Sequence, residues 1–127
     1  MFHIYQAYGE VYGTYMSAHL NMEFEAYLAQ FRYLAKTPGF YESKYYKEYV
    51  KHPMGKSINK LSDYLDKYGH LKEGRLEKEY KDHISSTMVD AFRNHSRGVY
   101  NEKDYPFDAS RVGGMNLKNF RAVAKDC

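Results

Sequence analysis

The sequence contains a single cysteine, no tryptophan, three prolines and no long apolar run. Because Cys127 is the only cysteine, an internal disulfide is excluded, and this favours a reducing compartment. No stretch approaches the ~18 apolar residues of a membrane-spanning helix. The first residues also lack the basic segment of a secretory signal. These absences predict a cytoplasmic protein that does not use a membrane.

Positive charge is absent from the first quarter of the chain and concentrated in the second. Residues 1–31 contain three glutamates and neither Lys nor Arg, whereas residues 32–60 carry Arg32 and six lysines against two glutamates. The net charge of residues 32–60 is therefore +5, although the whole chain has only +3. At 127 residues the chain fits one domain spanning 1–127, which can bury enough surface to fold without a metal.

Apolar residues recur at intervals of three and four, the spacing of one helix face, from Leu20 to Ala35. A second stripe with the same spacing runs from Tyr5 to Met22 and is offset in angle from the first. Two arrangements explain the offset. Residues 5–35 form either one long helix with a drifting apolar face or two helices broken near residues 19–22.

Two shorter helices are expected next, over residues 40–52 and 57–68. Thr37, followed by Pro38, has the pattern of an N-cap and first helical residue for the earlier helix. Pro53 is expected to end that helix, and Ser57 to cap the following one. In the 40–52 helix, Tyr41, Tyr45 and Tyr49 would share one face.

The most regular pattern belongs to residues 76–98, where apolar residues recur every four positions and Gly98 follows as a terminator. Residues 99–115 contain Pro106, Gly113 and Gly114 and predict an irregular loop. Asn116 could then cap a short last helix. The predicted fold class is therefore all-α, a compact bundle of four or five helices closed by this loop and helix.

Tyrosines and lysines alternate in the basic segment and form the candidate binding surface. Lysines neutralise phosphates or acidic side chains, and exposed tyrosines can stack on unpaired bases. The alternative is an ordinary amphipathic helix with tyrosines packed inward and lysines solvated. The Gly113–Gly114 turn beside Arg111 could also bind an anion. The candidate contact residues are Tyr41, Lys44, Tyr45, Lys47, Tyr49, Lys51 and Arg111.

Two histidine–carboxylate pairs lie one helical turn apart, His19 with Glu23 and Glu79 with His83. If their helices were neighbours, four ligands could meet at a metal inside the bundle. The spacing differs from the Glu-x-x-His pattern of such sites, and surface decoration is the alternative. No metal or other cofactor is expected.

The segment Lys81-Asp82-His83-Ile84, the Gly113–Gly114 pair and residues 119–127 resemble pieces of HNH endonucleases. The resemblance implies that Asp82 is a metal ligand, His83 the general base and Asn119 a structural residue of a metal-dependent nuclease. The sequence departs from the family pattern. The interval from His83 to Asn119 is too long, Ala124 replaces the first cysteine, and His83 falls in a strongly helical pattern rather than at the end of a strand.

The function expected from these observations is non-enzymatic binding of another macromolecule, with a protein partner favoured. This class includes inhibitors and adaptors of nucleic-acid-handling machinery. Direct nucleic-acid binding through the same lysines is the first alternative, and a metal-dependent hydrolase using Asp82 and His83 is the second. The sequence identifies neither the partner nor the oligomeric state.

Overall fold

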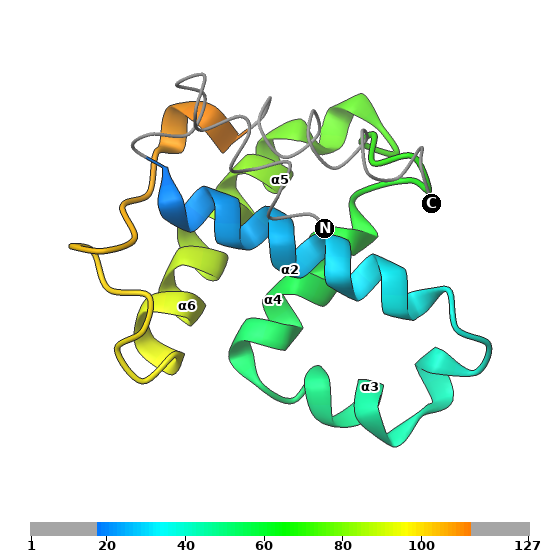
Figure 1. Ribbon diagram of the computed structural model, residues 1–127. Helices are drawn as coiled ribbons and strands as arrows, with labels where there is room; N and C mark the ends of the chain where they lie inside the picture. Colours follow the sequence, from blue (N-terminus) through cyan, green and yellow to red (C-terminus); the bar gives the residue numbers. More distant parts are fainter. Residues whose placement is uncertain (1–17, 113–127) are drawn as a thin grey trace.

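The computed structural model describes residues 18–112, and over this range the chain is all-α, as expected from its periodicity (Figure 1). Among the described residues the only β-type pairing is a single bridge between Leu65 and Leu71, and no strand occurs. The segments are α2 (His19–Ala35), η1 (Phe40–Glu42), α3 (Lys44–Tyr49), α4 (Pro53–Asp63), η2 (Gly74–Leu76), α5 (Glu77–Asp82), η3 (His83–Met88), α6 (Val89–His95) and η4 (Ala109–Arg111). Of the η segments, η3 is π-helical and the others are 3-10 turns.

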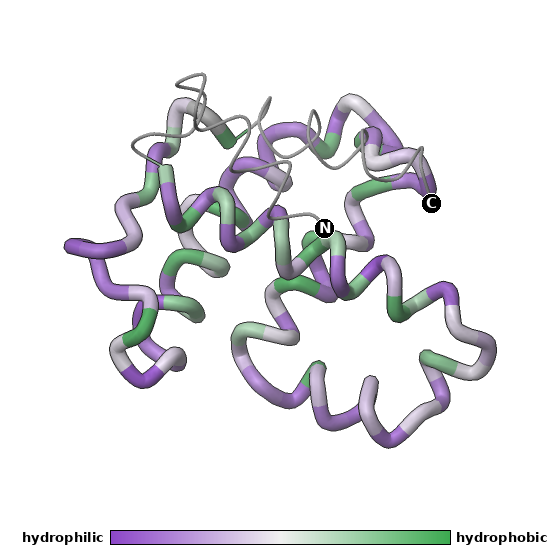
Figure 2. The backbone as a smooth tube through the Cα atoms, viewed as in Figure 1, coloured by the Kyte–Doolittle hydropathy of each residue, from purple (hydrophilic) through white to green (hydrophobic). Residues whose placement is uncertain are grey.

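The core forms around α4, which contacts α2, η3 and α6 (Figure 1). Ile58 and Leu61 of α4 have no exposed surface, and neither do Phe24 of α2 and Phe92 of α6. The rings of Phe24 and Phe92 meet edge to face with centroids 4.8 Å apart, a favourable aromatic geometry. Figure 2 shows hydrophobic residues on α2, α4 and α6 where these helices approach one another.

The helices α5 and α6 are joined without interruption through the π-helical segment η3. Its apolar row, with every member fully buried, consists of Tyr80, Ile84, Met88 and Phe92. In an α-helix, residues four apart drift about 40° around the axis at each step. A π-turn holds more residues, so each residue rotates less and the drift is offset. The π segment therefore keeps a row spaced strictly by four facing the core.

The C-terminal segment of the described chain packs on the start of α2. Asn21 is fully buried, its Nδ2 donates to the carbonyl of Asp108 at 3.0 Å, and its Oδ1 accepts from the Asp108 amide at 3.0 Å. The Leu20 amide, which has no partner within the helix, donates to Pro106 O at 3.1 Å. Arg93 of α6 donates to the carbonyls of Tyr100 and Tyr105. The described part of the irregular loop expected from residue 99 onward is thus bound to α6 through Arg93 and to α2 through Asn21.

Several predicted boundaries are wrong. The helix expected over residues 40–52 is divided, because Ser43 has an extended backbone between η1 and α3, and Gly39 with a left-handed φ of 77° precedes η1. Thr37 does not cap a helix; Ser43 caps α3, its Oγ accepting from the Tyr46 amide at 3.1 Å. Pro53 starts α4 instead of ending a helix.

The helix expected over residues 57–68 starts earlier, at Pro53. His52 is the N-cap, with Nδ1 accepting from the Met54 amide at 3.2 Å, and Pro53 takes the first helical position, where no amide is needed. Ser57, expected as a cap, lies buried inside α4 and donates to Met54 O.

The described residues decide one alternative at the N-terminal side. Ala18 has a non-helical backbone, with φ −136° and ψ 48°, so a single continuous helix through residues 5–35 is wrong. The tyrosine stripe before residue 18, the Gly113–Gly114 turn, Asn119 and the expected last helix lie outside the described residues. Within residues 18–112, no helix combines the length and apolar character that crossing a bilayer requires.

Candidate binding surface

The tyrosine–lysine segment forms a lobe that leaves the core at the end of α2 and returns to it at α4 (Figure 1). Gly39 turns the chain into η1, Ser43 starts α3, and His52 with Pro53 starts α4. Helix α3 has only six residues and no buried one, so its side chains serve mainly the surface.

Phe40 is the inner support of the lobe and is only 6% exposed. Its ring lies within 5.3 to 6.2 Å of three tyrosine rings, and it meets Phe31 of α2 edge to face at 5.7 Å. The three tyrosines around it are Tyr41, Tyr45 and Tyr46.

A second set of rings is stacked almost in parallel. Phe31 and Tyr49 have centroids 5.5 Å apart with 19° between planes, and Tyr49 and Tyr45 are 6.0 Å apart at 20°. Phe31 is 2% exposed, Tyr49 is half-buried and Tyr45 is 54% exposed. The stack therefore runs from the core to the surface and ends in an exposed ring.

The predicted face of three tyrosines is only partly formed. Tyr45 and Tyr49 stack, but Tyr41 lies in η1 and meets Tyr46 edge to face at 5.0 Å. Tyr41 is 52% exposed and joins the same group through Phe40. All three belong to one aromatic cluster, although they do not share one helix face.

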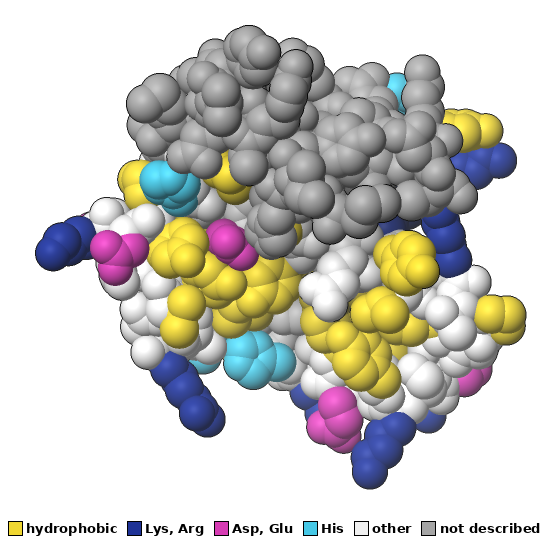
Figure 3. Space-filling model, viewed as in Figure 1, with side chains coloured by type: hydrophobic (Ala, Val, Ile, Leu, Met, Phe, Trp, Pro, Cys, Tyr) yellow, Lys and Arg dark blue, Asp and Glu magenta, His cyan; other side chains and the backbone are white. Residues whose placement is uncertain are grey.

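The three predicted lysines are all exposed. Lys44 and Lys47 belong to α3, while Lys51 lies beyond its end and contacts Glu48 at 3.3 Å. In Figure 3, hydrophobic side chains over this lobe adjoin side chains of lysine or arginine and of acidic residues. Arg111 lies in η4, away from this segment of the chain, and its side chain is outside the described part of the structure.

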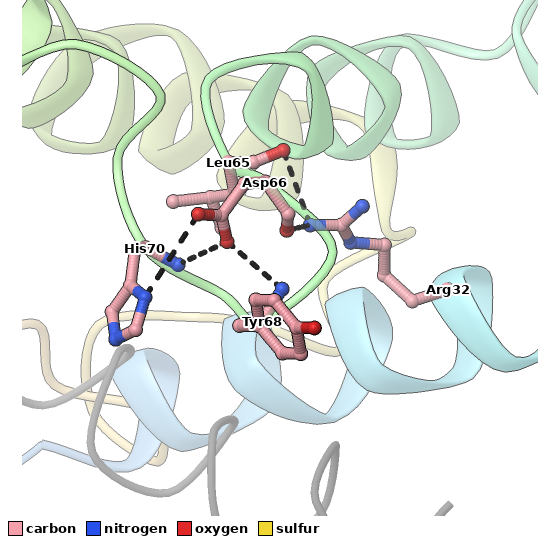
Figure 4. Close-up of polar contacts among 5 residues, drawn as sticks. All are labelled: Arg32, Leu65, Asp66, Tyr68 and His70. Atoms are coloured by element: carbon pink, nitrogen blue, oxygen red, sulfur yellow. Dashed lines mark hydrogen bonds and ion pairs between the residues drawn. The ribbon is translucent and has the colours of Figure 1, made fainter.

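Arg32 belongs to the basic segment in sequence but serves the fold. Its Nη2 donates to the carbonyls of Leu65, at 3.3 Å, and Asp66 (Figure 4). The Asp66 carboxylate accepts hydrogen bonds from the amides of Tyr68 and His70. Desolvation acts to raise the pKa of Asp66, but these two bonds, with His70 and Arg32 nearby, bring it below its usual value. The Arg32 charge is therefore directed to the turn rather than to a partner.

The phenol of Tyr49 remains neutral. Burial raises its pKa above the ordinary value, and the neighbouring Tyr45 and Tyr27 act in the same direction. Tyr49 is thus an uncharged member of the stack, and lysines and glutamates lie around it along the chain.

Sequence reasoning missed the supporting residues Phe31, Phe40 and Tyr46. Phe31 lies in the apolar stripe of residues 20–35, where it was expected to serve only the core. Tyr46 is half-buried and its hydroxyl donates to Asn59 Oδ1 of α4 at 3.2 Å. The signal for Phe40 and Tyr46 was the density of aromatic residues from 40 to 49, which exceeds what one short helix can bury.

The histidine–carboxylate pairs do not form a ligand cluster within residues 18–112, where no group of three His, Cys, Asp or Glu side chains is placed to hold a metal. Glu23 accepts from Tyr100 OH at 3.3 Å, and Glu79 is exposed on α5. His83 is 5% exposed, and its Nε2 donates to Ser57 O at 2.9 Å. Asp82, its neighbour in the HNH-like segment, is exposed at the end of α5.

Comparison of the chain with family models, with curated proteins and with solved structures finds no match. Exposed tyrosines and lysines of the lobe, together with the half-buried Tyr49, form an aromatic–basic surface, which consists of Tyr41, Lys44, Tyr45, Lys47, Tyr49 and Lys51.

Proposed function

We propose that this protein is a non-enzymatic binding module that engages an acidic macromolecule through the aromatic–basic surface. One observation carries the proposal. Tyr41 and Tyr45 are more than half exposed on a lobe whose inner side is already filled by Phe40 and Phe31. These tyrosines add large apolar faces where the core does not require them, and tyrosine is typical of interfaces because its ring is apolar and its hydroxyl can stay wet.

The charges of the same lobe indicate an acidic partner. The lobe, residues 36–52, carries four lysines and two glutamates, a net charge of +2, and two more lysines, Lys56 and Lys60, follow in α4. A surface of this sign attracts polyanions, and both acidic proteins and nucleic acids have the required charge. The probes below separate an acidic protein from a nucleic acid.

The test is a titration followed by fluorescence anisotropy at several salt concentrations. The probes are a labelled single-stranded oligonucleotide, the corresponding duplex and labelled poly-glutamate. We expect binding to at least one probe, with a Kd that increases as the salt concentration increases. For a single strand, the Lys44→Ala, Lys47→Ala, Lys51→Ala triple variant should reduce the slope of log Kd against log salt by about 2.

A charge-matched variant controls for the loss of net charge. Lys72, Lys78 and Lys103 are also exposed and lie outside the lobe, so their triple alanine variant should bind as the parent protein does. Equal weakening by both triple variants would show that only overall charge matters. Absence of binding to every probe at low salt would refute the proposal.

A further inference from the structure

The outermost ring of the stack has the position expected of a platform for another flat ring. Tyr45 stacks on Tyr49 on one side, with 20° between the planes, and is 54% exposed. The Phe40 ring also lies 6.2 Å from Tyr45, tilted by 52°, so a planar group would stack on the part of the Tyr45 ring that remains exposed and extend the series Phe31, Tyr49, Tyr45 by one member. Nucleobases stack on aromatic side chains in this way, whatever their sequence.

The platform is held in place before any partner arrives. The Tyr46 hydroxyl donates to Asn59 of α4, and Ser43 caps α3. Gly55 lies so close to α3 that a Cβ there would be 2.0 Å from Tyr49 O. Since the rings are already ordered, little conformational entropy is lost when a ligand stacks on them.

Two lysines are close to Tyr45 in the sequence. Lys44 precedes Tyr45 directly, Lys47 follows within the same helix, and both are exposed. A single-stranded nucleic acid offers unpaired bases and a phosphate for every nucleotide, so it satisfies the ring and the lysines together. A duplex keeps its bases stacked internally, and an acidic peptide would satisfy the lysines alone.

Resting on the proposed function, we infer that the acidic partner is a single-stranded nucleic acid and that one of its bases stacks on Tyr45. Lys44 and Lys47 neutralise the phosphates beside that base. Tyr41, whose ring also contacts Phe40, offers a second exposed ring to the same strand.

The deciding probe is a single strand in which every nucleotide is abasic, because it keeps the phosphates and lacks the bases. We expect the parent protein to bind the normal strand at least about fivefold more tightly than the abasic strand. Tyr45→Ala should remove this preference and leave affinity for the abasic strand unchanged. Tyr45→Phe, which keeps the ring, should retain the preference.

Tyr68 provides a matched control variant. It is 56% exposed, and Lys67 Nζ lies 5.1 Å from its ring centroid, so it is also a tyrosine beside a lysine. It belongs to the turn after α4 and not to the aromatic–basic surface, so Tyr68→Ala should keep the preference for bases. Circular dichroism of each variant verifies that the helical content is unchanged.

The possible failures are distinguishable. Equal affinity for normal and abasic strands, or a preference that survives Tyr45→Ala, would overturn the stacking inference while the lysine-dependent binding of acidic macromolecules stands. Tighter binding to poly-glutamate than to the normal strand would also overturn it and favour an acidic protein. Absence of binding to all probes would overturn both proposals.

Discussion

Asn21 ties the C-terminal segment of the described chain to α2 by hydrogen bonds to the backbone of Asp108. It is fully buried and forms two hydrogen bonds of 3.0 Å with the backbone of Asp108, 87 residues away in sequence. A buried polar group that loses its partner costs more than the bond itself contributes, because the group stays away from water. Removing this amide takes away these two hydrogen bonds from the amide and the carbonyl of Asp108.

We expect Asn21→Ala to lower the free energy of unfolding by about 2–3 kcal/mol. Asn94→Ala is the control, since Asn94 is exposed on α6 and should change stability by less than about 0.5 kcal/mol. Urea denaturation of the two variants measures the difference. Equal stability of both would mean that Asn21 does not hold the segment.

His83 couples stability to pH. Burial lowers its pKa below the ordinary value of 6.5, Lys60 acts in the same direction, and the hydrogen bond to Ser57 O opposes them. The Tyr64 ring also faces the imidazole, 6.0 Å away. Between the pKa of His83 in the unfolded chain and its lower pKa in the folded protein, the folded protein therefore binds fewer protons than the unfolded chain. The stabilising effect is complete above the unfolded pKa and is lost as the pH falls towards the folded one.

We expect the urea midpoint of the parent protein to decrease as the pH is lowered from about 7.5 to about 5. His83→Gln should flatten this dependence, because its amide can still donate to Ser57 O but does not titrate. His95→Gln, at an exposed position, should keep the parent slope. A slope that is unchanged in His83→Gln would contradict the assignment.

The placement of α3 against α4 depends on one close approach between elements. A Cβ on Gly55 would lie 2.0 Å from Tyr49 O and 2.9 Å from Tyr49 C, and backbone atoms cannot move aside as a flexible side chain can. Gly55→Ala must therefore displace α3 or the start of α4. We expect a loss of at least about 2 kcal/mol in thermal or urea unfolding.

Gly74→Ala is the matched control for that element. Gly74 lies in η2, and nothing stands within 4 Å of the position its Cβ would take. Its substitution should change stability little. If Gly55→Ala were as stable as Gly74→Ala, the close packing of α3 on α4 would be refuted.

Regular periodicity was sufficient to predict the elements that pack against each other along their length. α2 and the α5–α6 helix were located from their apolar rows, whose buried residues include Phe24, Leu28, Ile84 and Phe92. The region between them was predicted less well, because Gly39, Ser43 and Pro53 each fit more than one role in a turn. Their roles were decided by tertiary packing of Phe40 and Tyr49, which local sequence does not encode.

Charge and aromatic density in the sequence were sufficient to predict which segment carries the candidate surface, but not how its rings pack. Lys44, Lys47 and Tyr45 are exposed, as a binding role requires. The stack through Tyr49 to Phe31 could not be predicted, since it joins α3 to a residue of α2 that reads as an ordinary core position. The π-helical segment had one signal, a row spaced strictly by four, where an α-helix normally alternates three and four.

At the scale of the whole molecule, α4 links the parts of the fold, because it contacts α2, η3 and α6. One core cluster also includes residues of all these segments together with Phe40. We expect a single cooperative unfolding transition, with the same urea midpoint by far-ultraviolet circular dichroism and by tyrosine fluorescence. Two separated midpoints would show that the 36–52 lobe unfolds independently.

The π segment η3 accommodates one extra residue without changing the direction in which the flanking helices α5 and α6 face. Its wider turn absorbs one residue more than an α-helix would hold between α5 and α6. Ser85, Ser86 and Thr87 are exposed, so a chain lacking one of them could regain α geometry while Tyr80 and Phe92 still point to the same neighbours. A natural insertion that was accommodated without rotating either flank would leave the helix in this form.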